Sequence, residues 1–192
     1  MRIDRWAVVL ALGTSLGIAT AAADVLSGGL PPNEAARAAS VILNAGSTWA
    51  AVAVAAGWLV GHPPQGAFAG AAALLAAVVG YYAFGVLLGD RTEVGFAGVA
   101  GVLRLWALAA VVAGPVLGLV GAAIRSGGRI GLVASLVVPA GVVVEMIGLR
   151  RLDGRTFAVD PVLATTQGAM VAGAVVAGCA FLLRPGVPST TA

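Results

Sequence analysis

Six long apolar runs are the feature that most constrains what this chain can fold into. Each has, or nearly has, the roughly 20 apolar residues that a helix needs to cross the hydrocarbon core of a bilayer. The runs cover residues 6–23, 38–60, 67–88, 96–124, 130–149 and 161–183. Only 10% of the residues are charged, against about 25% in ordinary soluble domains. The sequence therefore predicts an all-α integral membrane bundle of six transmembrane helices.

The segments between the runs carry turn chemistry, as "SGGLPPNE" (27–34) and "RRLDGR" (150–155) illustrate. Asp160 followed by Pro161 is typical of an N-cap and the first helical residue, so we expect the sixth helix to begin there. The bundle is predicted to form one domain over residues 1–184, followed by a disordered tail at 185–192.

The first run has two interpretations. Arg2 and Arg5, an apolar core and the small residues before Asp24 also fit a secretory signal cleaved after Ala23. The run is long for a signal segment, and five more runs follow it. A retained first span is the simpler interpretation.

The charge distribution decides orientation only weakly. We call the N-terminal side of the membrane side A and the opposite side side B. Side A is predicted to carry Arg2, Arg5, Arg125, Arg129 and Arg184, and side B Arg37, Arg91, Arg150, Arg151 and Arg155. Because the counts tie, the positive-inside rule does not choose between the sides. An even number of spans keeps both termini together, and we expect them to be cytoplasmic in a bacterial inner or plasma membrane.

Several chemistries find no support in the sequence. The chain has one histidine, His62, and one cysteine, Cys179, so a multi-histidine or cysteine-based metal site is excluded. It has no Walker A loop and no credible nucleophile–base set. The eleven arginines are scattered rather than gathered on one stripe, which argues against nucleic acid. We therefore expect no enzyme activity, no cofactor and no nucleic-acid partner.

Polar and aromatic side chains recur at a similar depth in the side B half of the helices. We predict that they converge on a ligand-binding cavity that opens to side B and suits a small polar or zwitterionic solute. The predicted lining comprises Asn44, Thr48, Trp49, Tyr81, Arg104, Trp106, Glu145 and Gln167.

Arg104 is the one basic residue within the apolar runs. A carboxylate facing lipid is costly, so Glu145 should face the bundle and seek a partner. We predict that Arg104 and Glu145 pair, either lining the cavity or acting as a structural clasp. The alternative is that Arg104 extends to the lipid headgroups.

Three pairs of glycines stand four residues apart: Gly13–Gly17, Gly66–Gly70 and Gly114–Gly118. Such pairs let helices approach closely. The main prediction is packing within one chain, and the alternative is a homodimer face.

Four stretches resemble a family of small membrane proteins of unknown function, found mainly in high-GC Gram-positive bacteria. They are "LNAGSTWAAVAVAAGWLVG" (43–61), "VVGYYAFG" (78–85), "LWALAAVVAGPVLGLVG" (105–121) and "VEMIG" (144–148). The resemblance covers about residues 40–150 and implies no activity. It implies that Asn44, Trp49, Tyr81, Trp106, Gly114, Pro115, Gly118 and Glu145 are characteristic positions.

The layout is also similar to that of the substrate-capture subunits of energy-coupling-factor transporters, which have about six helices and a pocket near the outer face. In those proteins small-residue motifs on the first helix dock a partner, and Gly13–Gly17 and Ala19–Ala23 have that form. Two functions remain open. The first is binding or transport of a small polar solute. The alternative is a non-catalytic structural or assembly role with another membrane protein or a second copy of the chain.

Overall fold

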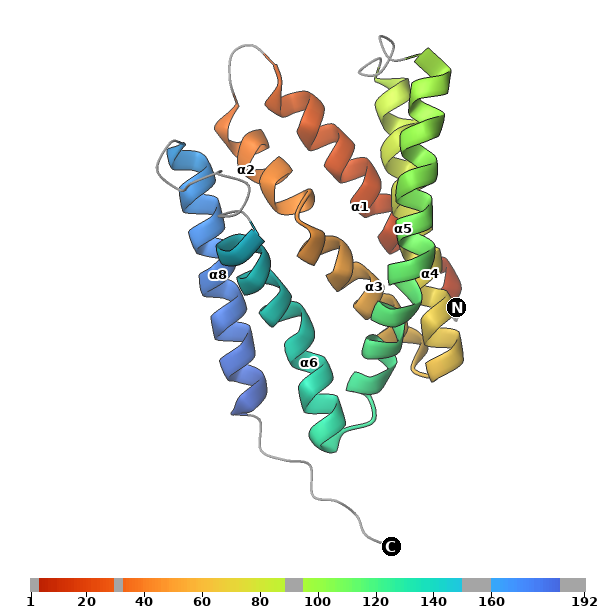
Figure 1. Ribbon diagram of the computed structural model, residues 1–192, viewed down its shortest axis with the longest axis vertical. Helices are drawn as coiled ribbons and strands as arrows, with labels where there is room; N and C mark the ends of the chain where they lie inside the picture. Colours follow the sequence, from red (N-terminus) through yellow and green to blue (C-terminus); the bar gives the residue numbers. More distant parts are fainter. Residues whose placement is uncertain (1–3, 30–32, 89–94, 150–159, 184–192) are drawn as a thin grey trace, which may run out of the picture.

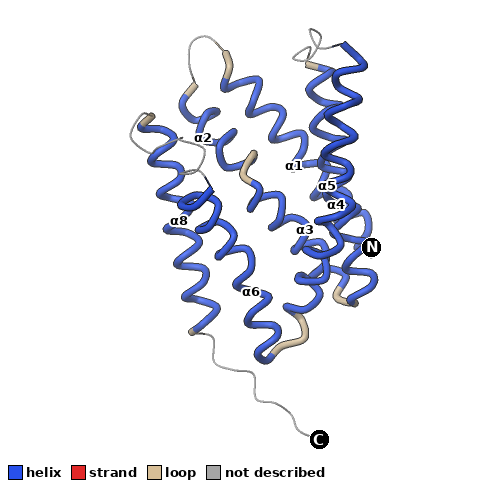
Figure 2. The backbone as a smooth tube through the Cα atoms, in the orientation of Figure 1, coloured by secondary structure: helices blue, strands red, loops and turns tan. Residues whose placement is uncertain are grey.

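The computed structural model describes residues 4–29, 33–88, 95–149 and 160–183. Within these ranges the chain is helical apart from caps and short turns, and Figure 2 draws no strand in them. The elements are α1 (Arg5–Ser27), α2 (Glu34–Leu43), α3 (Gly46–Val60), α4 (Pro63–Leu87), α5 (Gly95–Ile124), α6 (Gly128–Val143), η2 (Val144–Leu149) and α8 (Pro161–Leu182). The predicted tail 185–192 and six of the arginines used for orientation, Arg2, Arg91, Arg150, Arg151, Arg155 and Arg184, lie outside the described residues.

Five helices are long and apolar enough to cross a membrane, and α2 with α3 forms a sixth candidate span that is bent by 56°. Successive spans run in alternating directions (Figure 1). The all-α membrane bundle is confirmed. The prediction of one continuous helix over residues 38–60 is wrong, because the chain breaks at Asn44 and Ala45.

Polar caps explain where several helices begin. The Asp4 side chain accepts a hydrogen bond from the Trp6 N–H (3.1 Å), and the Asn33 side chain accepts one from the Ala36 N–H (3.0 Å). Asp160 caps α8 by accepting from the backbone N–H groups of Val162 and Leu163. The predicted N-cap Asp160, with Pro161 as the first helical residue, is confirmed.

Helices α1, α3, α4 and α5 form a tightly packed half of the molecule, which we call the packed half. Its helices touch backbone to backbone: a Cβ added at Gly13 or Gly17 would overlap carbonyl groups of α4, and one at Gly118 would overlap the Gly66 carbonyl of α4. Gly70 and Gly114 meet in the same way. All three predicted glycine pairs are therefore used for packing within the chain. Since α4 covers Gly13 and Gly17, these two are not open to a partner helix.

The other half is a pair of helices formed by α6, with its continuation η2, and α8, which we call the outer pair. α6 and α8 lie side by side in Figure 1. They pack on each other, and α6 also packs on the end of α5 while α8 packs on α2. Large apolar side chains such as Ile130, Val133 and Val176 stay about two-thirds exposed. The outer pair thus leaves most of its surface for lipid or another chain.

Candidate functional site

The break between α2 and α3 leaves backbone groups that a continuous helix would have satisfied. Ala45 is the N-cap of α3, and it has no side-chain oxygen that could accept from the first amides of that helix. In a membrane, an unsatisfied backbone N–H costs several kcal/mol by order of magnitude. The first amides of α3 therefore need an acceptor from elsewhere in the chain.

Glu145 of η2 supplies that acceptor from 99 residues away in the sequence. Its Oε1 accepts from the Gly46 N–H at 2.8 Å, and its Oε2 accepts from the Ser47 N–H at 2.8 Å. The positive end of the α3 dipole also favours a carboxylate at this position. Glu145 therefore acts as a remote cap of α3. The π-helical geometry of η2, a form frequent at functional sites, includes Glu145 itself.

The carbonyls at the end of α2 accept hydrogen bonds from side chains at the start of α3. The Thr48 hydroxyl donates to the Ile42 carbonyl (2.6 Å), and the Trp49 indole N–H donates to the Leu43 carbonyl (2.8 Å). Thr48 is not among the residues that line the cavity described below. In the described structure Thr48 instead satisfies a backbone carbonyl at the break.

A second carboxylate, Asp24 near the end of α1, gathers three donors. Its Oδ1 accepts from the Ser40 hydroxyl (2.6 Å) and the Asn44 amide (2.7 Å), and its Oδ2 accepts from the Tyr81 hydroxyl (2.8 Å). No basic side chain among the described residues forms a salt bridge with it. Asp24 is not among the predicted site residues, because nothing local in the sequence shows that α2 and α4 bring donors to it.

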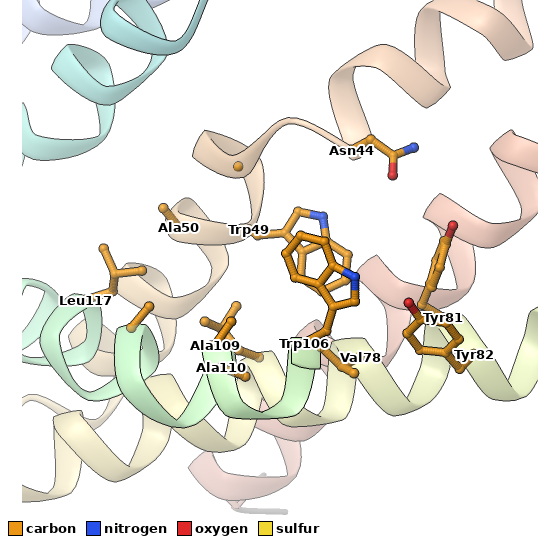
Figure 3. A pocket seen from close by; sticks show the side chains of 13 residues that line it. Asn44, Trp49, Ala50, Val78, Tyr81, Tyr82, Trp106, Ala109, Ala110 and Leu117 are labelled. Carbon is orange, nitrogen blue, oxygen red and sulfur yellow. The ribbon is translucent and has the colours of Figure 1, made fainter. Parts of the chain in front are cut away.

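A cavity of about 400 Å³ lies between the break and helices α4 and α5. Figure 3 shows the rings of Trp49 and Trp106 in its middle, Tyr81 and Tyr82 toward one end, and Ala50 and Leu117 toward the other. The two tyrosine rings meet edge to face with centroids 5.1 Å apart. The full lining is Asn44, Gly46, Trp49, Ala50, Leu74, Val78, Tyr81, Tyr82, Trp106, Ala109, Ala110, Ala113 and Leu117. It is mostly apolar and aromatic, with few polar groups.

Of the eight predicted site residues, four line this cavity: Asn44, Trp49, Tyr81 and Trp106. Both carboxylates bind residues of the lining. Asp24 holds the lining residues Asn44 and Tyr81, and Glu145 holds the lining residue Gly46.

The predicted pair of Arg104 and Glu145 is wrong in the described structure. Arg104 is exposed, and Glu145 binds the α3 amides instead. Arg104 stands two positions before the lining residue Trp106, which is about 200° around the helix axis, so Arg104 points away from the cavity. The pair was predicted because the two residues lie at similar depth in the membrane. Depth does not determine toward which side of its helix each side chain points.

Gln167 of α8 is also outside the cavity. It is fully buried, and neither its amide nitrogen nor its amide oxygen has a hydrogen-bond partner among the described residues. The Ser47 hydroxyl is buried and without a partner as well. The described residues contain no group of three or more histidine, cysteine or acidic side chains placed to hold a metal ion.

The model of DUF6518, described as a family of unknown function, matches residues 2–192. No curated protein and no solved structure matches the chain.

Proposed function

The chain belongs to DUF6518, a family of unknown function, and we propose from its geometry that it binds a small solute in the cavity between α3, α4 and α5. The observation that carries the proposal is the cavity itself, about 400 Å³ in volume and lined by four aromatic side chains. Small-molecule sites are concave, mostly apolar and furnished with a few convergent polar groups. This cavity has that character.

The broken span supports the same proposal. Discontinuous membrane helices are where many transporters place their substrate sites, because broken backbone offers polar groups at membrane depth. Here the break brings Asn44, Gly46 and Trp49 to the cavity wall. Transport across the membrane is the extension of binding that this arrangement favours. We place the cavity opening toward side B, with both termini on the cytoplasmic side of a bacterial cell membrane.

A cavity-filling substitution tests the binding proposal. Ala113 lines the cavity, whereas Val111 is exposed on α5 outside the lining. Purified protein would be screened by thermal shift and tryptophan fluorescence against chemically diverse small metabolites. We expect at least one solute to stabilise the wild type and the Val111→Phe control, but not Ala113→Phe. If every solute that binds shifts all three proteins equally, the cavity is not the binding site.

Orientation is tested separately with reporter fusions. A reporter after the C-terminus should read cytoplasmic, and one inserted at residues 150–155 should read the opposite side. A C-terminal reporter outside the cell would reverse the orientation.

An assembly role is the second candidate, and the exposed outer pair favours it. Leu119 of α5 faces Ile130 and Val133 of α6 across an open apolar groove near side A. A second copy or another membrane protein could cover this groove. Crosslinking between cysteines placed at Ile130 in the native membrane would reveal such a partner, and lipid alone would give no crosslink. Under either function we expect no catalysis and no cofactor.

A further inference from the structure

The hydrogen-bond donors around the cavity are almost all engaged within the protein. The Asn44 amide donates to Asp24 and to the Ser40 carbonyl, the Tyr81 hydroxyl donates to Asp24, and the Trp49 indole donates to the Leu43 carbonyl. The Gly46 N–H is held by Glu145. The Trp106 indole N–H forms no hydrogen bond within the described part of the chain. A ligand rich in acceptors would therefore find few donors.

Among the described residues, the charged side chains that bind the cavity lining are both negative. Asp24 and Glu145 stand behind the lining residues, and both are held by neutral donors rather than by a cation. Arg37 forms a salt bridge with Asp160 and is not available to either of them. Arg104 points away, so no described basic side chain lines the cavity. Carboxylates near a partly enclosed apolar space attract a cation and repel an anion.

The aromatic side chains of the cavity wall also favour a cation. Faces of tryptophan and tyrosine rings carry negative charge density, and cations bind over them. Trp49, Trp106, Tyr81 and Tyr82 come from three helices and line one cavity, with the two tyrosines toward one end of it (Figure 3). Because the Trp49 N–H is engaged with the Leu43 carbonyl, that side chain contributes its ring rather than a donor.

We propose, on the premise that the cavity is a solute site, that its ligand is a small organic cation such as an amine or a quaternary ammonium with an apolar body. The aromatic rings hold the cationic head, and Asp24 and Glu145 supply the compensating charge from behind. The carbonyls at the break are engaged by Thr48 and Trp49, so the ligand is recognised by charge and ring faces rather than by backbone carbonyls.

Three probes of nearly equal shape and different charge test this directly. They are choline, its uncharged carbon isostere 3,3-dimethyl-1-butanol, and the anion 3,3-dimethylbutanoate. Binding would be followed by tryptophan fluorescence and calorimetry with full-length protein in uncharged maltoside micelles, which do not themselves attract cations. We expect choline to bind about tenfold more tightly than the neutral isostere. The anion should bind more weakly than either.

Variants locate the effect. Asp24→Asn keeps a side chain that can bond Asn44 and Tyr81 but removes the charge, and it should weaken choline binding about fivefold. Its control is Glu34→Gln, which removes an exposed carboxylate at the start of α2 and should change nothing. Trp106→Leu should weaken binding about tenfold. Its control is Trp6→Leu at the side A end of α1.

The outcomes separate this inference from the proposed function. If choline and its neutral isostere bind equally and both are lost in Trp106→Leu, the cavity is a site but its ligand is not a cation. If the anion binds best, the charge argument is overturned. If none of the three binds, the cation inference is also overturned, and the metabolite screen with Ala113→Phe judges the proposed function independently. The probe series on the wild type decides the charge even if Asp24→Asn fails to fold.

Discussion

The packed half and the outer pair contain similar glycine-rich helices but use their glycines differently. In the packed half, Gly57 and Gly118 meet backbone to backbone, and so do Gly17 and Ala77. In the outer pair, Gly141, Gly168 and Gly173 have nothing within contact distance of an added Cβ. A glycine pattern in a membrane sequence therefore indicates close packing only where another helix backbone is present. The outer pair is held to the rest of the protein at few points, and Glu145 is one of them.

Substituting a contact glycine should have the largest effect on this comparison. In Gly118→Ala the new methyl group overlaps the Gly66 carbonyl, so α4 and α5 must separate. We expect a loss of about 3 kcal/mol in the free energy of unfolding, since overpacking that moves backbone lies at the upper end of such costs. Thermal unfolding in micelles measures it.

The matched control is the same substitution in the outer pair. Gly173→Ala meets open space in α8 and removes a poor helix former. It should leave the unfolding temperature unchanged or raise it slightly. A large loss for Gly173→Ala would show that a partner surface covers the outer pair in the purified protein, and the contrast between the two halves would then be wrong.

Removing the remote cap should have the second-largest effect. Glu145→Ala leaves the Gly46 and Ser47 amides without acceptors and releases η2 from α3. We expect about 2 kcal/mol of destabilisation, because an unsatisfied donor costs roughly 1 to 3 kcal/mol when buried and less where it is exposed, as at Gly46. Proteolysis of the outer pair and thermal unfolding would both report it.

A local cap supplies the control for this prediction. Ala45→Ser places an acceptor at the N-cap of α3 and should restore about 1 kcal/mol to Glu145→Ala. The same serine in the wild type should add little, because Glu145 already holds the amides. If Ala45→Ser fails to improve the Glu145→Ala protein, capping is not how Glu145 stabilises the bundle.

The salt bridge between Arg37 of α2 and Asp160 of α8 should have the smallest effect, because both side chains are partly exposed. Burial raises the pKa of Asp160, but the Leu163 amide, the Arg37 guanidinium and the Val162 amide outweigh it and lower the pKa below its ordinary value of 3.8. Because the folded pKa is lowered, the contribution to stability is fully present above pH 3.8 and is lost as the pH falls through the lower folded value.

Comparing wild type with Arg37→Gln across this range checks the sign. The difference in unfolding temperature should be constant near neutral pH and disappear in acid. A difference that grew in acid would contradict the lowered pKa. Asp160→Asn, which keeps an oxygen to cap α8, should lack this pH dependence.

Local features of the fold could be predicted from the sequence. Apolar length located the spans, and Asp160 with Pro161 located the start of α8, because both depend on neighbouring residues alone. The break in the second span could also have been predicted from neighbouring residues. In "NAGST" (44–48) every residue but Ala45 is a poor helix former or a turn residue, although the stretch lies within an apolar run.

The site depended on information that the sequence does not hold locally. Asn44, Trp49, Tyr81 and Trp106 were found because depth and side-chain chemistry could be estimated. Arg104 was misplaced because depth gives no rotation about the helix axis. The partners of Asp24 and Glu145 lie 16 to 99 residues away in the chain, so they follow only from the packing.

The distance along the chain between Glu145 and α3 has a consequence for biogenesis. The ribosome releases residues 34–60 long before it reaches residue 145, so this span is synthesised before its cap, and we expect it to enter the bilayer uncapped. At that stage the conformation of lowest free energy for residues 38–60 is an unbroken helix, because its amides bond to carbonyls of the same helix. The bend, and the cavity wall that it forms, therefore arises late, when the fifth span is inserted and η2 arrives. Nascent chains that end before Glu145 should hold a membrane-inserted second span but no cavity.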